Sequence, residues 1–330
     1  MKKRIELPIF QPDFICYNHL TYADAIIRAN AKEKDKILMT SKYINCYYKE
    51  ESVQHKFVIS IFDHWCTTQK VMQNQNLNLL KTTYQSLQIN MISVIKKFLC
   101  NSSYVFGQCN YSYIEPLKKP EPPLFNYVIT GFDDIRRQFT VYGLDINNNF
   151  ICKQIDYAIF IDSLLDTSKP NISFSLWKFN QETNIEFDIP NIIFELEDYI
   201  NSENRRNHYK EDKVYGISAI ECLREYLSQK IDSVEEINEF YLKKLLCHKK
   251  YMRDRIECLN NYKFIDGRWL YDADRVYAIA LNIYEQGKAL NTNKDTALGA
   301  HLVNLFSEMI DIEKPYLFSV LNELKLNNTN

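Results

Sequence analysis

The sequence predicts an α+β fold in two parts, an N-terminal domain with an antiparallel sheet and an all-α helical bundle after it. Short apolar runs flanked by turn residues mark strands in the first part, among them 127–131 and 139–144. Apolar residues spaced by three and four fill the second part, as in packed helices. A polar, unpatterned stretch at 201–207 lies between them, so we expect domains at 1–200 and 208–330.

The overall composition is that of an ordinary globular protein and excludes several classes of function. The chain has 330 residues, 46% of them hydrophobic, and a formal net charge of −2. This near-neutral charge argues against a broad face for nucleic acid or for an anionic membrane. The sequence has no Gly-rich phosphate loop and no apolar run of transmembrane length. We therefore expect neither nucleotide binding nor a membrane span.

The use of cysteine indicates a reducing compartment. The nine cysteines are odd in number, irregularly spaced and without a CxxC pair, which is unlike a disulfide framework. The basic N-terminus lacks the apolar region of a signal peptide, because Pro8 and Pro12 interrupt the short apolar stretch after it. We therefore expect a cytoplasmic protein with reduced thiols.

The first half of the N-terminal domain begins with a helix over 17–31, which starts at or just after Cys16. The spacing of Leu20, Ala23, Ile26 and Ile27 gives this helix one apolar face. A buried strand is expected at 57–62, a second helix at 87–99 and a further strand at 104–106.

The second half of this domain begins with a loop that is rich in proline and long enough to arch over a site. Its prolines are Pro116, Pro120, Pro122 and Pro123. The strands at 127–131 and 139–144 come next, joined by a short polar turn, and then a helix at 156–165. A strand at 173–179 and a helix at 191–200, with Pro190 in its first turn, complete the domain.

Helices with short connections are expected throughout the second part, which indicates an antiparallel bundle. Ser233 and Glu236 match a capping box ahead of a long helix. Pro315 should break or kink the last helix, because proline lacks the amide proton that an interior turn needs.

Cys16 is the first candidate for chemistry. At a helix N-terminus the thiolate meets the positive end of the helix dipole, which lowers the thiol pKa. The side-chain amide of Gln11 is a candidate oxyanion donor, and Asp145 is a candidate for orienting a base. The alternative interpretation is a buried cysteine that packs as a small hydrophobic residue.

Other histidine, cysteine and basic clusters have simpler interpretations. His64 with Cys66, and Cys247 with His248, supply only two ligands each, so we expect no metal site and no bound cofactor. Lysines and arginines concentrate at 243–255, where acidic neighbours dilute them. A solvated helix face is the expected interpretation, and the alternative is a docking patch for a carrier protein and the phosphate of its phosphopantetheine.

Three stretches of the first domain resemble the papain-like proteins of antibiotic biosynthesis. These stretches are 11–27, 87–106 and 125–145, the last followed by the helix at 156–165. The segments 215–218 and 248–256 resemble the helical half of such proteins. The family includes butirosin-type acyl-carrier-protein acyltransferases and closthioamide-type amide ligases, and double-glycine leader peptidases are more distant members. The resemblance implies a papain-like fold for the first domain.

The resemblance also implies a role for single residues. Cys16 matches the nucleophile and Asp145 the third member of the triad, while Gln11 lies one residue closer to the cysteine than the usual oxyanion glutamine. Asn126 stands at the position of the base, where the family carries histidine, and asparagine cannot accept and return a proton near neutral pH. His19, one helical turn after Cys16, is an alternative base, although a surface histidine is the simpler interpretation.

The resemblance implies two alternative functions. In the first, Cys16 takes an acyl group from a carrier-protein thioester and passes it to an amine, in the biosynthesis of a peptide- or polyketide-type natural product. In the second, the protein is a catalytically inactive member of the family that binds a carrier protein or serves as a scaffold. Both imply an acyl or peptidyl carrier protein as partner; the first adds a small-molecule acceptor. The retained Cys16, Gln11 and Asp145 favour the first function, and Asn126 favours the second.

Overall fold

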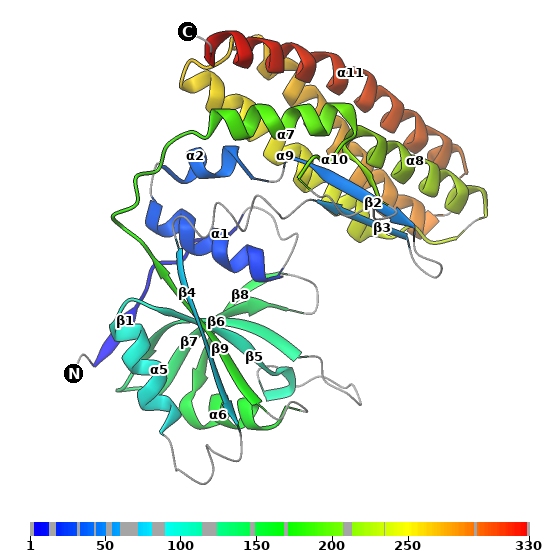
Figure 1. Cartoon of the computed structure of the whole chain (residues 1–330). Coiled ribbons are helices and arrows are strands. Elements are labelled where there is room, and N and C mark those ends of the chain that lie inside the picture. Colours follow the sequence, from blue (N-terminus) through cyan, green and yellow to red (C-terminus); the bar gives the residue numbers. More distant parts are fainter. Residues whose placement is uncertain are drawn as a thin grey trace. The chain divides into compact units, whose positions relative to one another are not determined.

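The fold is α+β, with antiparallel sheets in the N-terminal part and a helical region after them (Figure 1). The computed structural model describes residues 3–12, 18–31, 34–42, 44–50, 55–59, 72–80, 90–113, 124–145, 149–167, 171–206, 213–233, 235–293 and 296–328. The chain divides into two compact units. The first unit comprises Met1–Lys32 and Thr68–Thr183, and the second comprises Glu33–Thr67 and Asn184–Asn330.

The first unit is built on one antiparallel sheet. Its strands run in the order β4-β9-β5-β6-β7-β8, and β1 pairs with β6 beside this path. The elements are β1 (Arg4–Glu6), α1 (Asn18–Ala31), β4 (Met72–Leu80), α5 (Met91–Cys100), β5 (Tyr104–Asn110), η2 (Tyr111–Tyr113), β6 (Leu124–Asp133), β7 (Gln138–Leu144), β8 (Phe150–Asp156), α6 (Tyr157–Leu165) and β9 (Asn171–Phe179).

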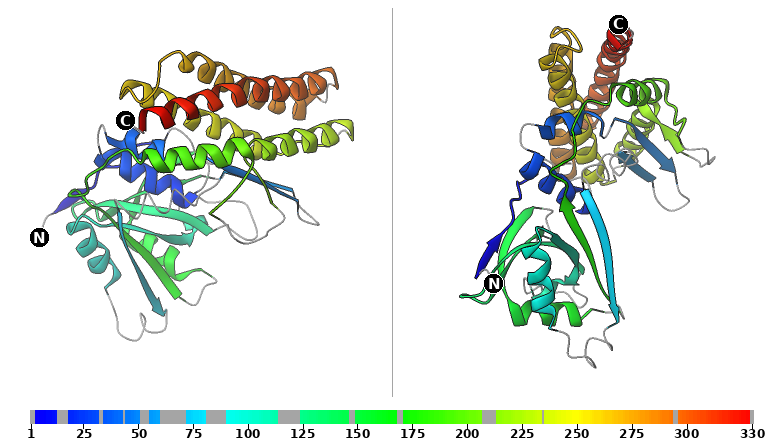
Figure 2. Two further views of the ribbon diagram at one scale, coloured as in Figure 1. Left: turned by 45° about the horizontal axis from the view of Figure 1, so that its top comes forward. Right: turned by 60° about the vertical axis from the view of Figure 1, so that its left-hand side comes forward.

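The core of the first unit lies on one face of this sheet, against α5 and α6 (Figures 1 and 2). Successive side chains of a strand point to opposite faces, so Val105 and Cys109 of β5 enter this core whereas Phe106 faces the other way. The ring of Phe106 lies 5.5 Å from that of Tyr22, which comes from α1. The helix α1 therefore contacts the face opposite to α5 and α6.

The second unit combines helices with a small antiparallel sheet of order β10-β2-β3. Its elements are α2 (Asp35–Thr40), β2 (Cys46–Glu50), β3 (His55–Ile59), α7 (Ile189–Asn201), β10 (Lys213–Tyr215), α8 (Gly216–Asp232), α9 (Glu239–Asn261), α10 (Trp269–Asn293) and α11 (Thr296–Asn328). No described helix combines the length and apolar composition needed to cross a membrane.

Several basic side chains of α9 are buried. Lys244, Lys249 and Arg255 are 6%, 1% and 1% exposed, so the expectation of a solvated face is wrong for these three residues. Arg255 Nε donates a hydrogen bond to the Thr40 carbonyl over 2.6 Å, and its Nη2 donates to the carbonyl of Lys42. A guanidinium thus fixes the backbone between α2 and β2, where helix and sheet bonds do not reach.

His248 and Lys244 extend this arrangement along the same helix. His248 Nε2 lies 2.8 Å from the Ile44 carbonyl, and Lys244 Nζ donates to the Phe57 carbonyl over 3.0 Å. His248 is fully buried, as expected for a core histidine. The side chains of α9 therefore hold the segment from α2 to β3 in the second unit, which is why Glu33–Thr67 belongs there.

Lys249 makes a fully buried ion pair. Its Nζ atom lies 2.6 and 2.8 Å from the two carboxylate oxygens of Glu313, and both side chains have no exposed surface. The hydroxyl of Tyr199 joins them, 2.8 Å from Lys249 Nζ and 3.0 Å from Glu313 Oε2. These contacts connect α7, α9 and α11 through one network whose charges compensate each other.

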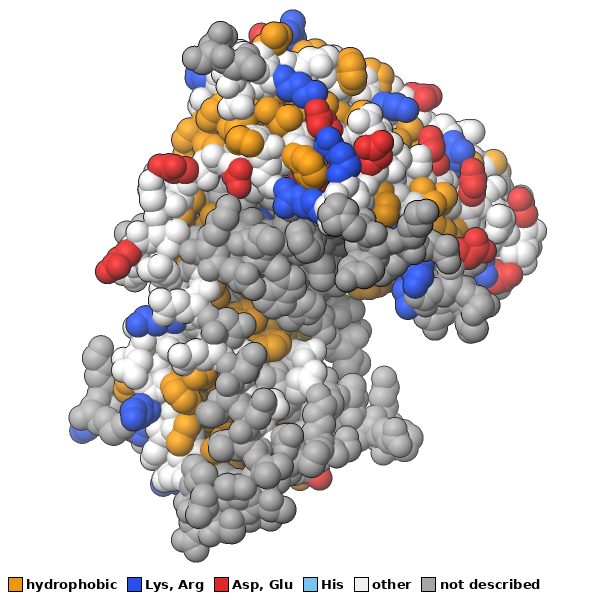
Figure 3. Space-filling view, in the orientation of Figure 1, with side chains coloured by type: hydrophobic (Ala, Val, Ile, Leu, Met, Phe, Trp, Pro, Cys, Tyr) orange, Lys and Arg blue, Asp and Glu red, His pale blue; other side chains and the backbone are white. Residues whose placement is uncertain are grey.

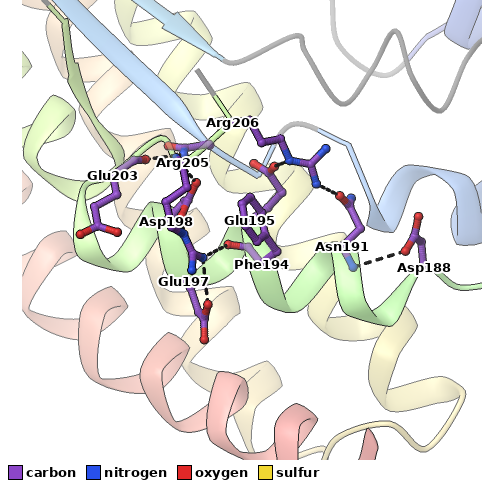
Figure 4. A network of polar contacts seen from close by, with 10 residues as sticks. Asp188, Asn191, Phe194, Glu195, Glu197, Asp198, Glu203, Arg205 and Arg206 are labelled. Carbon is purple, nitrogen blue, oxygen red and sulfur yellow. Dashed lines mark hydrogen bonds and ion pairs between the residues drawn. The ribbon is translucent and has the colours of Figure 1, made fainter. Parts of the chain in front are cut away.

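The segment after α7 folds back on that helix (Figure 4). The backbone N–H of Arg205 donates to Asp198 over 2.9 Å, and its guanidinium bonds Asp198 and Glu197. Arg206 Nε lies 2.7 Å from Glu195. The guanidinium groups of Arg205 and Arg206 also lie 4.2 and 4.9 Å from the ring centroid of Phe194.

These contacts place the division of the chain earlier than the sequence suggests. The polar stretch at 201–207 was expected to separate domains at 1–200 and 208–330. Its described residues Arg205 and Arg206 are instead bonded to side chains of α7. The helix α7 packs on α8 and α11, and the compact units divide between Thr183 and Asn184.

Most elements predicted for the first part of the chain are present in the structure. In the second part, several features differ from the prediction. The predicted helices at 17–31, 87–99, 156–165 and 191–200 correspond to α1, α5, α6 and α7. The capping box is wrong: α9 begins after Asn238, whose side chain accepts from the Phe240 N–H, while Ser233 Oγ donates to the Gln229 carbonyl at the end of α8. The helix α11 continues through Pro315.

Glu313→Gln should destabilise the second unit strongly, because it leaves Lys249 charged and buried without a counter-ion. We expect the unfolding free energy to fall by about 3–5 kcal/mol, measured by urea denaturation. The ion pair of Lys250 and Asp254, also on α9, is partly exposed. Lys250→Met is therefore a matched control, which should change the unfolding free energy by about 0.5 kcal/mol. The double variant Lys249→Met with Glu313→Leu removes both charges and should recover most of the stability lost in Glu313→Gln. If the double variant is as unstable as Glu313→Gln, the charge argument is contradicted.

His248 should make stability sensitive to acid. Burial, followed by the nearby Lys249 charge, holds the His248 pKa well below its usual value. As the pH falls, His248 is protonated in the unfolded chain before it is protonated in the folded one. Its contribution to the free energy of unfolding is therefore complete above about pH 6.5 and is lost below it, by at most about 1.4 kcal/mol per pH unit. Urea midpoints between pH 7.5 and 5 should show a smaller slope for His248→Asn than for the native chain. His301→Asn, on the exposed side of α11, should keep the native slope, and equal slopes in all three proteins contradict the prediction.

Candidate functional site

The N-terminal segment and α1 bring the first candidate residues to the sheet. Leu7 N–H donates to the Thr130 carbonyl over 2.7 Å, and Phe10 N–H donates to the Ala25 carbonyl over 3.2 Å. Gln11, the candidate oxyanion donor, comes directly after Phe10 and is exposed. Cys16 lies outside the described residues, but α1 begins two residues after it, at Asn18. Residues 7–10 are therefore hydrogen-bonded to β6 at one end and to α1 at the other.

Tyr22 fixes α1 to the strands at the position of Asn126. The pairing of β6 with β7, which shifts register between Ile129 and Gly131, runs as far as Tyr127 and Gly143. At the next position, the Tyr22 hydroxyl donates to the Asn126 carbonyl over 2.7 Å and also bonds the backbone of Leu144. The phenol thus occupies the place of the next rung of the ladder. Burial raises the pKa of Tyr22, and the Leu144 backbone bond offsets only part of this effect, so the hydroxyl keeps its proton.

Asn126 is paired through its side chain with a residue of the neighbouring strand. Gln108 of β5 is its direct partner in the sheet, and Gln108 Nε2 donates to Asn126 Oδ1 over 2.9 Å. Both side chains are half-buried. A carboxamide pair can orient a polar ligand, but it cannot carry a proton from a thiol.

Asp145 is engaged in the turn between β7 and β8. Its Oδ1 accepts from the Asn149 backbone N–H over 2.8 Å, and its Oδ2 accepts from Asn149 Nδ2 over 2.9 Å. Asp145 N–H also donates to the Asn149 carbonyl over 3.0 Å. Both carboxylate oxygens therefore already hold the turn, which accounts for an aspartate at the end of β7 without any role beside a base.

Of the four predicted site residues, the contacts place Asn126 alone in a group, and its two partners are residues that the sequence analysis missed. Asn126 lies beside α1, and Tyr22 and Gln108 complete a group that we call the Asn126 site (Tyr22, Gln108 and Asn126). Tyr22 is not one of the residues whose spacing marks the apolar face of this helix, so no pattern in the sequence singles it out. Gln108 becomes recognisable only once β5 and β6 are paired, and no local signal gives that register.

The remaining candidates are outside the described residues or lack partners for metal binding. His64 and Cys66 lie outside the described residues, as does the side chain of His19. Within the described ranges, no three or more His, Cys, Asp or Glu side chains gather as they would around a metal ion. Cys247 is buried, and its neighbour His248 uses Nε2 to contact a backbone carbonyl.

Comparison with protein-family models and with curated proteins finds no match to this chain.

Tyr22→Phe should loosen the contact between α1 and the sheet. The change removes a buried hydroxyl and leaves the Asn126 carbonyl without its donor, so we expect a loss of about 1–3 kcal/mol in urea denaturation. The control is Tyr271→Phe, whose ring on α10 is 70% exposed and which should cost less than about 0.5 kcal/mol. A Tyr22→Phe protein as stable as the control would mean that β6 and β7 close to form the missing rung directly.

Proposed function

We propose that the first unit is a papain-like domain of natural-product biosynthesis that has lost proton transfer and binds the acyl or peptidyl arm of a carrier protein. The observation that carries this proposal is the hydrogen bond between Gln108 and Asn126 at the position of the base. The protein then serves as a binding or scaffold module for a carrier protein and not as a transferase.

The chemistry of a cysteine nucleophile supports this choice. A papain-type site needs a base that accepts the thiol proton and a third group that orients the base. Asn126 has no basic atom, and both carboxylate oxygens of Asp145 accept hydrogen bonds from Asn149. Asn126 therefore cannot meet the first requirement, and Asp145 already has a structural role in the turn between β7 and β8.

The same carboxamides suit recognition of an acyl arm. The bond from Gln108 engages Asn126 Oδ1 and leaves the Nδ2 amino group able to donate. Thioester and amide carbonyls, which an acylated phosphopantetheine arm carries, are acceptors for such a donor. The bond from Tyr22 fixes the backbone of Asn126, so the amino group is held in position before the ligand arrives.

Acyl transfer by Cys16 is the second candidate, favoured by the start of α1 two residues after the cysteine and its attachment beside Asn126. In this reaction the Cys16 thiolate attacks the thioester carbonyl, and the carrier thiol leaves with a proton. An amine then attacks the acyl-cysteine, its proton passes to the leaving thiolate, and an amide and free Cys16 result. Gln11 would donate to the oxyanion.

An acyl-pantetheine thioester distinguishes the two functions. We expect the native chain to bind it without gaining the mass of an acyl group, and Asn126→Ala to bind about fivefold more weakly, the loss of one neutral hydrogen bond. Titration calorimetry and intact-protein mass spectrometry measure the two effects. Asn304→Ala, on an exposed position of α11, should bind as the native chain does.

An acylated native chain, with no acylation in Cys16→Ala, would replace the binding proposal with acyl transfer. Site-resolved alkylation of the cysteines across a pH series supplies an independent check. A Cys16 that reacts much faster than the other thiols below pH 7 is an activated thiolate, as transfer requires.

A further inference from the structure

The turn between β6 and β7 carries the most exposed large apolar side chain in the described part of the chain. Ile135 is 80% exposed, and Arg136 and Arg137, which follow it, are exposed as well. We call residues 134–137 the hairpin tip. A single apolar side chain in solvent is ordinary on a protein surface, so its meaning depends on the groups around it.

The backbone of the hairpin tip is held in one shape. Asp133 Oδ1 accepts from the N–H of Ile135 over 2.9 Å and from that of Arg136 over 3.1 Å. Arg137 has a φ of +58°, in the left-handed region, where a side chain other than glycine or asparagine is strained. An arginine therefore stands where glycine would fit with less strain, which points to a use of its guanidinium outside the fold.

The acidic side chains at this end of the sheet already serve the fold. Lys96 Nζ lies 2.6 Å from both carboxylate oxygens of Asp134, and the Tyr157 hydroxyl donates to the same carboxylate over 2.9 Å. Although burial opposes the effect, these bonds and the charge of Arg137 hold the pKa of Asp134 below its usual value. Asp156 caps the N-terminus of α6. Both carboxylates are half-buried, so the outer surface is left to other groups.

Basic side chains surround the hairpin tip. Arg4 of β1 is the sheet partner of Asp133, and Asp134 N–H donates to the Lys3 carbonyl over 2.9 Å, so β1 lies beside the tip. Lys3 and Arg4 are exposed, as are the two arginines of the tip. On the left of the first unit in Figure 3, where Figure 1 shows β1, the described charged side chains are mainly basic.

Much of this positive charge is not compensated within the described chain. Arg4 Nη2 lies 3.4 Å from Glu6 Oε2. Among the described residues, none forms an ion pair with Lys3, Arg136 or Arg137. The exposed surface around the hairpin tip is therefore positive, with an apolar side chain at its centre.

We propose that the hairpin tip is the docking point for the acidic surface of the carrier protein, with Ile135 as the apolar anchor. This inference rests on the proposed function, which makes a carrier protein the partner of the first unit. Carrier proteins are small and acidic, so an apolar centre with a basic rim is complementary to them. The helix α9, whose basic residues the sequence also offered for docking, is a poorer candidate because Lys244, Lys249 and Arg255 are buried.

The hairpin tip and the Asn126 site lie at a separation that a carrier and its arm can bridge. Asn126 and Asp133 are seven residues apart on β6, which is about 24 Å at the rise of a strand. Phosphopantetheine has about as many backbone atoms as four or five peptide residues and reaches about 15–18 Å. A carrier helix adds its own diameter of about 10 Å. A carrier held at the tip can therefore deliver its acyl group to Asn126.

Nucleic acids and anionic membranes would be attracted by the same charges but suit the hairpin tip less well. Both need an extended basic surface, whereas the whole chain has a net charge of −2. A small basic rim around one apolar residue is instead typical of a protein interface.

The test is titration calorimetry of the full chain with the acyl carrier protein of a bacterial fatty-acid synthase in its apo form, which lacks the phosphopantetheine arm. We expect this carrier to bind, and to bind more weakly as salt is raised. Arg136→Gln should weaken binding about threefold to fivefold, and Ile135→Ser about tenfold. Both variants should bind free acyl-pantetheine as the native chain does, because the arm alone does not reach the tip.

Arg137→Gly separates docking from a structural role. Glycine relieves the left-handed strain, so this variant should melt no earlier than the native chain while the carrier binds about fivefold more weakly. Lys263→Gly is the matched control. Lys263 is an exposed basic residue of the second unit with a φ of +64°, and its replacement should leave carrier binding unchanged.

Unchanged carrier affinity in the three tip variants overturns the docking proposal, as does a carrier that does not bind. Tighter binding of an oligothymidylate, or of vesicles of phosphatidylglycerol and phosphatidylcholine, also overturns it. Free acyl-pantetheine that fails to bind counts against the proposed function instead. Binding of the apo carrier that depends on the tip would still be detected in that case, so the two failures are distinguishable.

Discussion

The second unit depends on the burial of cations along α9. Backbone carbonyls that lie inside a protein need donors, and the chain between α2 and β2 gains them from Arg255 and His248. Buried charges are costly unless each one is paired or bonded, and the unit meets that requirement in two ways. Arg255 donates to carbonyls, and Lys249 is neutralised by Glu313. An α9 with only apolar side chains could still pack in the core, but the carbonyls of Thr40 and Ile44 would then have no hydrogen-bond donor from this helix.

In the first unit, the position of one hydroxyl determines what the candidate site can do. Tyr22 takes the place of a rung between β6 and β7, at the position of Asn126. The neighbouring side chains then form their own bonds, Asn126 with Gln108 and Asp145 with Asn149. Both bonds hold their side chains in fixed orientations, which the proposed binding of an acyl arm would use.

The sequence predicted the elements that depend on local pattern and missed those that depend on pairing. The helices α1, α5, α6 and α7 have clear apolar faces, and β6 and β7 are apolar runs bounded by turn residues. By contrast, β4 alternates Asn and Gln, and β10 has three residues and exists through pairing with β2. The basic residues of α9 were expected in solvent because lysine and arginine are seldom buried, and only tertiary contacts place them inside. Likewise, nothing in the local sequence pairs Gln108 with Asn126.

The placement of residues 33–67 in the second unit has a consequence for synthesis on the ribosome. The carbonyl of Phe57 accepts its hydrogen bond from Lys244, which lies 187 residues further along the chain and is synthesised later. At ordinary translation rates that interval is about 10–40 s, during which Cys46, Tyr48 and Phe57 have no helix to cover them. The early segment is therefore exposed to chaperones and to wrong partners for most of the time that the chain is being made. The first unit is complete at Thr183, but residues 33–67 within its span cannot pack until the C-terminal helices have been made.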